Sequence, residues 1–294
     1  MSTNITTGFS QKFASNVELL LQQKMSRLRG AVRVDNYRGS KQAQIVQQVG
    51  SMAAQKRTTR HSDTPILNTP HDARWVFPED YEWGDLIDKA DEIKTLASFE
   101  SPYVMTATAA LNRAMDDEII GAFFSDTTKT GETGSTTTDW TTFVAANAGH
   151  KITSSSVGLT VAKLRAAVKA LRKAEVDLDN DQIFCAVTAD EIDDLFTETQ
   201  MISLDYNTNA VLVDGKIRPF MGINFIHTER LLSASSEHRV PVWAKSGMAL
   251  GIWNDVNARV AERADKSFST QVYASLSVGA TRVEEKKVVE ILCA

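Results

Sequence analysis

The sequence SPYVMTATAALNRAMDDEIIGAFF runs from Ser101 to Phe124 and predicts one long helix. Ser101 is a good N-cap, and Pro102 follows it at the first helical position, where a missing N–H costs nothing. Apolar residues then recur at the spacing of one helix face, at Val104, Ala107, Leu111, Ala114, Met115, Ile119 and Phe123. We therefore expect a helix over residues 102–124.

After a Thr- and Gly-rich loop at 125–142, the chain alternates between helix and strand patterns. A helix is expected from Thr160 to Glu175, and the apolar run 183–187 predicts a buried strand. Thr188 and Glu191 have the spacing of a capping box that opens a helix at 190–198. Further strands are expected at 211–213, 223–226, 240–243, 248–253, 268–278 and 288–292. The fold class is therefore α+β.

The N-terminal part of the chain has a different character. Residues 1–55 are rich in Gln, Ser and Lys and predict an extended arm that needs partners to become ordered, with one amphipathic helix at Asn16–Arg29. Two strand-like stretches, 74–77 and 81–83, flank a turn at 78–80 and predict a projecting hairpin. An isolated hairpin is marginal in water, so this one is expected to lean on a partner.

Charge is distributed unevenly along the 294 residues, whose net charge is −5. The first sixty residues contain ten basic and two acidic side chains, a charge of +8, which leaves −13 on the remainder. A basic arm on an acidic body can bind nucleic acid or the acidic body of a neighbouring copy. Composition alone does not choose between them.

Motifs that carry chemistry are not found, so we expect no catalytic residues, no cofactor and no metal site. The two cysteines, Cys185 and Cys293, form neither a disulfide framework nor a zinc spacing, and the five histidines lack metal-ligand spacing. The loop 131–135 lacks the lysine of a phosphate-binding loop. Acidic helix stretches such as 116–118 are expected to be solvated or at an interface. No signal peptide or membrane-spanning run is present, which favours a soluble protein made in the cytoplasm.

Several segments, in order and spacing, resemble one family. They are 83–88 (WGDLID), 101–104 (SPYV), 111–116 (LNRAMD), 158–165 (GLTVAKLR), 220–226 (FMGINFI), 261–266 (AERADK) and 279–285 (GATRVEE). The chain resembles the major capsid proteins of tailed bacteriophages with the Hong Kong 97-type fold. The likeness covers nearly the whole chain and is clearest from Trp75 onward.

This resemblance implies an architecture and a role. It implies an N-terminal arm at 1–55, an extended β-hairpin loop at 56–88, and a peripheral domain at 89–159 whose spine helix is 102–124. It further implies a mainly axial domain at 160–256 and return strands of the peripheral domain at 257–294. Family members form pentamers and hexamers that close into an icosahedral shell around double-stranded DNA in the virion. Their usual partners are a scaffolding protein, a portal and, in some phages, a decoration protein, with no membrane.

Assembly-interface candidates come from the arm and the hairpin. Arg27, Arg29 and Arg33 are expected to contact an acidic neighbour, and Trp75, Phe77 and Trp83 are residue types that anchor interfaces. Two alternatives stay open. One is an encapsulin-like compartment shell of the same fold, and the other is a cytosolic enzyme or nucleic-acid-binding module.

Overall fold

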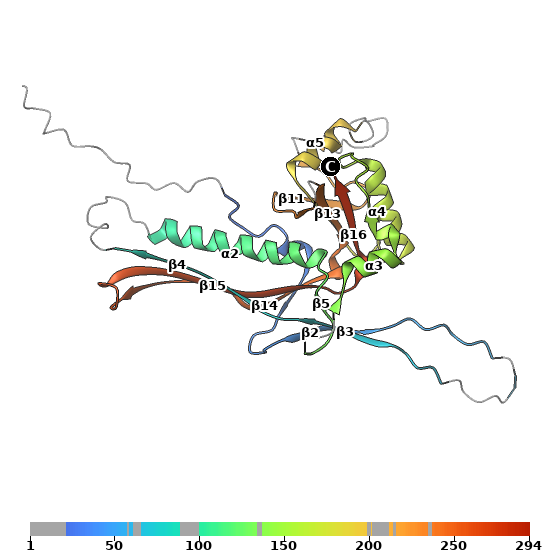
Figure 1. Cartoon of the computed structure of the whole chain (residues 1–294), viewed down its shortest axis with the longest axis horizontal. Helices are drawn as coiled ribbons and strands as arrows, with labels where there is room; N and C mark the ends of the chain where they lie inside the picture. The colour runs from blue at the N-terminus through green and yellow to red at the C-terminus, as the bar shows by residue number, and fades with distance from the viewer. Residues whose placement is uncertain are drawn as a thin grey trace, which may run out of the picture. The chain divides into compact units, whose positions relative to one another are not determined.

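The computed structural model describes residues 22–57, 59–60, 66–88, 100–133, 137–198, 201, 212–213, 216–234 and 237–294. They are drawn in colour in Figure 1 and are divided between two compact units. The first unit comprises Met1–Ser26, Asp80–Ala114 and Asn254–Leu276, and the second comprises Arg27–Glu79, Met115–Trp253 and Ser277–Ala294.

The elements confirm a mixed α+β fold. The α-helices are α2 (Glu100–Phe123), α3 (Trp140–Ala146), α4 (Val161–Lys173) and α5 (Ala189–Thr197), and the 3-10 turns are η2 (Arg29–Ala31), η3 (Ala148–His150), η4 (Lys245–Gly247) and η5 (Glu285–Lys287). The strands are β1 (Arg33–Asn36), β2 (Ala43–Val49), β3 (His71–Val76), β4 (Glu79–Ile87), β5 (Thr128–Lys129), β6 (Thr137–Thr138), β7 (Lys151–Ile152), β8 (Ile183–Val187), β9 (Leu212–Val213), β10 (Lys216–Ile217), β11 (Ile223–His227), β12 (Ser233–Ala234), β13 (Glu237–Ala244), β14 (Met248–Arg263), β15 (Ser269–Arg282) and β16 (Val288–Cys293). The helices predicted at 102–124, 160–175 and 190–198 are confirmed as α2, α4 and α5.

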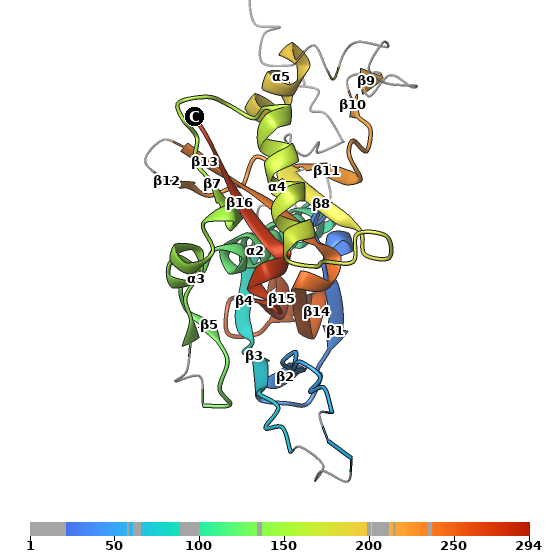
Figure 2. The same cartoon turned by 90° about the vertical axis from the view of Figure 1, so that its right-hand side faces the viewer.

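A six-stranded sheet forms the core of the second unit. Its order is β11-β8-β13-β16-β7, and β12 pairs with β13 off this path. Helix α4 packs on β16, as Figure 2 shows, and its apolar face joins a core that includes Leu164, Leu171, Cys185 and Val242. The apolar residues that recur at helical spacing along α4 are therefore the ones that are buried.

The ends of α4 and α5 are built as the sequence predicts. Thr160 caps α4, because its side-chain oxygen accepts the N–H of Lys163. Thr188 and Glu191 form the predicted capping box of α5, in which the Glu191 carboxylate accepts the N–H of Thr188 at 2.7 Å. Both helices thus begin where local hydrogen-bonding chemistry places them.

The second half of the segment 1–55 finds pairing partners within the same chain. Strand β1 pairs in parallel with β14, and Arg33 lies opposite Ala249. The indole N–H of Trp243 donates to the carbonyl of Ala31 at 2.9 Å, and Leu28 is fully buried. These residues are therefore part of the second unit.

The helix predicted at Asn16–Arg29 is wrong over residues 22–28. Residues 16–21 lie outside the described part of the chain, and 22–28 are not helical. The backbone N–H groups of Arg27 and Leu28 donate to the carboxylate of Asp116, at 3.0 and 3.2 Å. A long-range contact therefore overrides a weak local helix pattern.

The hairpin predicted between residues 74–77 and 81–83 is wrong in its pairing. Strand β3 pairs with β2, and β4 lies beside β15 in a four-stranded sheet of order β1-β14-β15-β4. The chain therefore passes from one sheet to another at Pro78, whose lack of an N–H suits a break between strands. The ribbon present in the structure is β2–β3.

The first unit contains most of β4 together with parts of α2, β14 and β15. The rings of Trp83 and Tyr103 meet edge to face with centroids 6.4 Å apart. The guanidinium of Arg113 donates to the side chain of Gln22 and to the carbonyl of Gln23, at 2.8 and 3.1 Å. These contacts hold residues 22–24 against α2.

Candidate assembly surfaces

All three predicted basic residues are engaged within their own chain. The guanidinium of Arg27 donates to the carbonyl of His227 at 2.6 Å and to its Nδ1 at 2.8 Å. Arg33 pairs with Asp35 at 2.8 Å on the exposed side of β1. Arg29 is half-buried in η2. The three side chains therefore do not form one free basic patch.

Asp116 is the residue that fixes the start of the second unit, and the sequence did not single it out. The stretch 116–118 was expected to be solvated or at an interface, yet Asp116 is fully buried within its own subunit and accepts the N–H groups of Arg27 and Leu28. Asp117 agrees better with this expectation, because its side chain is exposed. It forms an ion pair with the half-exposed Arg230. Adjacent acidic residues on a helix point in different directions, and only the fold decides which one is buried.

The predicted aromatic anchors lie in different units. Trp75 and Phe77 are half-buried in the second unit and line a hollow of about 180 Å³ with the end of α2 and residues 279–281 of β15. Trp83 belongs to the first unit. Gly279 is required at the hollow, because an added Cβ would lie 2.2 Å from the carbonyl oxygen of Phe77. The structure therefore brings Trp75 and Phe77 together but not Trp83.

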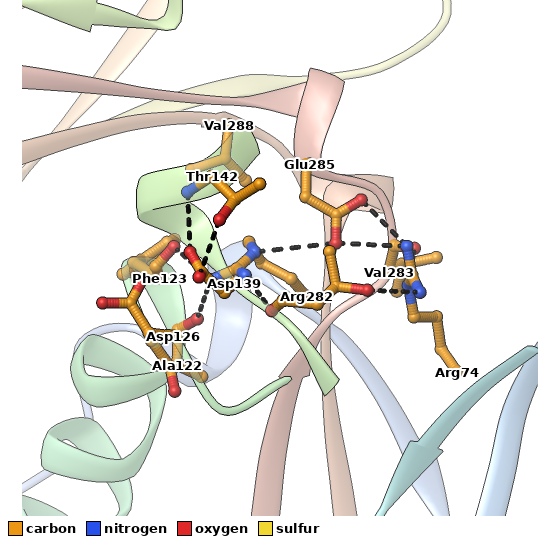
Figure 3. A network of polar contacts seen from close by, with 12 residues as sticks. Arg74, Ala122, Phe123, Asp126, Asp139, Thr142, Arg282, Val283, Glu285 and Val288 are labelled. Atoms are coloured by element: carbon orange, nitrogen blue, oxygen red, sulfur yellow. Dashed lines mark hydrogen bonds and ion pairs between the residues drawn. The ribbon is translucent and has the colours of Figure 1, made fainter. Parts of the chain in front are cut away.

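A buried ionic network joins β3 to β15 (Figure 3). Arg74 is only 4% exposed and donates to the two carboxylate oxygens of Glu285 at 2.9 and 3.1 Å. Its Nε donates to the carbonyl of Val283 at 3.2 Å. A two-pronged Arg–carboxylate contact fixes geometry as well as charge. Arg74 is therefore a structural residue of this unit.

Arg282 is the centre of the same network and is fully buried. It donates to the carbonyls of Ala122 and Phe123, at 3.2 and 3.0 Å, which lie in the last turn of α2. A cation at a helix C-terminus satisfies carbonyls that have no partner within the helix. Desolvation lowers the pKa of Arg282 to about 10, although Glu285 opposes the shift. The residue remains charged at neutral pH.

Asp139 and His150 complete the surroundings of this network. The backbone N–H of Thr142 donates to Asp139, the N-cap of α3, at 2.7 Å, and this bond lowers the pKa of Asp139. His150 is buried against the Phe143 ring, and its Nδ1 lies 3.0 Å from the carbonyl of Val288. Burial lowers the pKa of His150.

The far end of the β2–β3 ribbon presents an apolar and basic surface, which we call the ribbon tip. Its exposed residues are Val49, Met52, Ile66 and Leu67 together with Lys56, Arg57 and Arg60. Ile66 is 97% exposed. Exposed apolar side chains grouped in this way are typical of a surface that contacts another protein. Most of the ribbon tip lies in the loop expected at 56–88, and Val49 and Met52 lie at the end of the expected arm.

The described residues offer no metal-ligand cluster, no exposed thiol and no membrane-spanning helix. The residues placed there contain no group of three or more His, Cys, Asp or Glu able to hold a metal ion. Both thiols are buried, and burial raises the pKa of Cys185 and raises that of Cys293 to about 12. None of the helices described has the length and apolar character needed to cross a bilayer.

Several solved structures have a similar architecture. The chain is 15% identical to a chain in the capsid structure of the cyanophage P-SCSP1u, with a TM-score of 0.76, covering 100% of this chain and 95% of that one. For a chain of Mycobacterium phage Che8 the identity is 14%, the TM-score 0.71 and the coverage 96% of both. For the capsid of a native GTA particle the identity is 11%, the TM-score 0.73 and the coverage 99% and 97%. No curated protein sequence matches the chain.

The fold is therefore that of a tailed-phage major capsid protein of the Hong Kong 97 type, as the resemblance implied. A family model for phage capsid proteins matches residues 5–294, and the chain belongs to the phage capsid protein family. It is a structural subunit of the phage head shell, found in the virion, and not an enzyme.

Proposed function

We propose that this subunit forms pentamers and hexamers that close into an icosahedral head around double-stranded DNA, which it encloses without reading its sequence. Assembly takes place in the cytoplasm of the bacterial host with a scaffolding protein and a portal, and with a decoration protein where the phage encodes one. The observation that carries the proposal is the family match over residues 5–294. The solved capsids cover the same length, so the likeness extends across the whole chain.

The domain boundaries that the resemblance implies are part of the proposal. Residues 89–159 and 257–294 build the peripheral domain, with α2 as its spine, and 160–256 build the domain around which copies meet. The loop proposed at 56–88 is shared between two elements, because its first part leads into the β2–β3 ribbon and its last part is β4. Exposed apolar side chains at the ribbon tip are available to a neighbouring subunit.

The basic arm is the second proposed contact, and replacing Arg27, Arg29 and Arg33 by glutamate tests it. Assembly should fail while the far-ultraviolet circular dichroism of the dispersed subunit stays unchanged. Normal shells from the triple variant would refute a role for the arm.

Electron microscopy of the purified chain, with and without its scaffolding protein, tests the proposal as a whole. Shells of phage size, or rings of five and six, are expected. Small uniform shells formed without a scaffold would instead indicate a compartment protein of the same fold. A dispersed monomer under every condition would refute self-assembly.

A further inference from the structure

Helix α4 presents a face to solvent that carries only basic and small side chains. Its five charged residues are all basic, and Lys163 is buried, where it donates to the carbonyls of Val157 and Leu292. The exposed face consists of Ala162, Arg165, Ala166, Lys169, Arg172 and Lys173. We call this surface the basic face of α4.

The charges of the basic face have no partners in the part of the chain that the structure describes. Arg165, Lys169 and Arg172 follow one another at spacings of four and three residues, and none of them forms an ion pair there. Like charges at these spacings destabilise a helix by about 0.2–0.5 kcal/mol per pair. The arrangement is therefore unfavourable in the free subunit and favours an acidic partner.

A groove with an apolar floor runs along the basic face. Its volume is about 370 Å³, and it is lined by Arg165, Val168, Lys169, Arg172 and Met221. Met221 and Gly222 have positive φ angles of 54° and 81° and form a tight turn closed by Phe220 and Ile223. This turn holds the Met221 side chain outward, where it is 37% exposed. The groove thus suits a segment with one apolar side chain and acidic neighbours.

Helix α5 of the same chain has that composition. It contains Asp190, Glu191, Asp193 and Asp194 and no basic residue. Glu191 is buried in the capping box, and Asp194 accepts the N–H of Leu159 at 2.9 Å. Asp190 and Asp193 remain exposed on the outer face, beside the half-buried Phe196. Neither of these two carboxylates has an ion pair among the described residues.

Within one subunit, α5 lies beyond the N-terminal end of α4 (Figure 2) and is held there by the contact between Asp194 and Leu159. Its outer face therefore does not occupy the groove of its own chain. Two complementary surfaces at different places on one subunit are what a cyclic ring requires, since each copy uses one surface toward the copy before it and the other toward the copy after it.

We propose that the groove on the basic face of α4 binds α5 of a second copy of this chain, and that this contact joins neighbouring subunits in the ring. Phe196 fills the groove above Met221, and Asp190 and Asp193 pair with Lys169 and Arg172. The inference rests on the proposed function, because it assigns the surfaces through which the 160–256 segments meet.

Duplex DNA is the other polyanion that a basic helix could bind, and two observations favour a second subunit. The groove has an apolar floor, which a phosphate backbone cannot use. The turn after α4 carries Glu175, Asp177 and Asp179 exposed beside the basic face, and these would repel DNA. A compact acidic helix can avoid that turn, whereas a rigid duplex cannot.

Charge reversal on each helix tests the contact. One variant carries Lys169→Glu with Arg172→Glu, a second carries Asp190→Lys with Asp193→Lys, and a third carries all four changes. Each two-site variant should raise the subunit concentration needed for ring formation at least about tenfold, and the four-site variant should restore it to within about threefold of the original. A matched control, Arg259→Glu with Lys266→Glu, changes the net charge as much as the α4 variant but lies outside the contact. Circular dichroism confirms that each subunit folds.

Mixing the two defective variants gives a sharper readout. In the mixture each copy is repelled by its own kind and attracted by the other, so alternating rings form. Rings of six can alternate, whereas rings of five cannot, so mass photometry should find hexamers without pentamers. A mixture that assembles no better than its components would overturn the proposal.

The remaining outcomes distinguish failure of the α4–α5 contact from failure of the proposed function. If the original subunit forms no rings or shells, the proposed function fails before the contact is tested. If it does form rings and the α5 variant assembles normally, the contact proposal is wrong. An α4 variant that forms normal shells but packages less DNA would assign the basic face to DNA and would also overturn it.

Discussion

Replacing the buried Arg282 by methionine tests whether the network of Figure 3 stabilises the subunit. Its guanidinium donates to three carbonyls, those of Ala122, Phe123 and Thr138. Hydrogen bonds from a charged donor contribute about 1.5–3 kcal/mol each, so the three contribute about 4.5–9 kcal/mol. The cost of burying the charge opposes this gain. Desolvation lowers the pKa of Arg282 from 12.5 to about 10, and a fall of that size corresponds to about 3 kcal/mol.

The difference leaves a net stabilisation of about 1–6 kcal/mol, so we expect Arg282→Met to lower the free energy of unfolding by about 3 kcal/mol. The loss should appear in urea denaturation of the dispersed subunit, followed by circular dichroism and by the fluorescence of Trp140, whose ring lies 5.2 Å from the guanidinium. Arg259→Met on the exposed part of β14 is the control and should change stability by less than about 0.5 kcal/mol.

A second substitution separates the shape of the guanidinium from its charge. Arg282→Lys keeps the positive charge but cannot reach the carbonyls at the end of α2 and that of Thr138 at once. We expect it to lose nearly as much stability as the methionine variant. A methionine variant within about 1 kcal/mol of the original protein would refute the reasoning, because the network would then be energetically neutral. A lysine variant of full stability would show that charge alone matters.

Three further outcomes are expected. Gly279→Ala should destabilise the subunit by about 1–3 kcal/mol, because its Cβ would force the carbonyl of Phe77 to move; the urea midpoint measures this, and an unchanged midpoint would contradict the close approach. Cys185 and Cys293 should resist a thiol reagent at pH 8 in the folded subunit and react fully in denaturant, since burial raises both pKa values; fast labelling of the native protein would count against this packing. The folded-state pKa of His150 is lowered by burial, so its contribution to stability is complete above the unfolded value near 6.5 and is lost as the pH falls through the lower folded value. The stability of His150→Gln should therefore change less between pH 7.5 and pH 5 than that of the original protein, and parallel pH profiles would refute the idea.

Local signals in the sequence predicted α2, α4 and α5, but they missed α3, whose start lies in the loop expected at 125–142, and they wrongly predicted helix over residues 22–28. The cap at Thr160, the capping box at Thr188 and the apolar repeat of α2 each act within a few residues, so the information needed is contiguous. The core strands β8 and β16 were likewise predicted from apolar runs. What these signals cannot contain is which strand pairs with which, and the wrong hairpin at 74–83 is an error of that kind.

The polar residues of the interior were missed for the same reason. Asp116 and Asp117 are identical in type and adjacent, yet only Asp116 is buried, by a segment 88 residues away. Arg74 and Glu285 are 211 residues apart. Their pairing follows from the fold and leaves no local pattern. The groove on α4 could be predicted only in part. Its run of basic residues is visible in the sequence, but its apolar floor includes Met221, which only the fold brings beside the helix.

The pairing of β1 with β14, and of Ala31 with Trp243, also bears on the timing of synthesis. These partners are separated by 212 residues in the case of Trp243, and a ribosome adding about 5–20 residues per second takes about 10–40 s to cover that distance. During this interval the early part of the chain lacks the strand and the indole that complete its packing. Chains emerging from neighbouring ribosomes on one messenger RNA therefore hold unfinished surfaces, and we expect them to join a growing shell only after release.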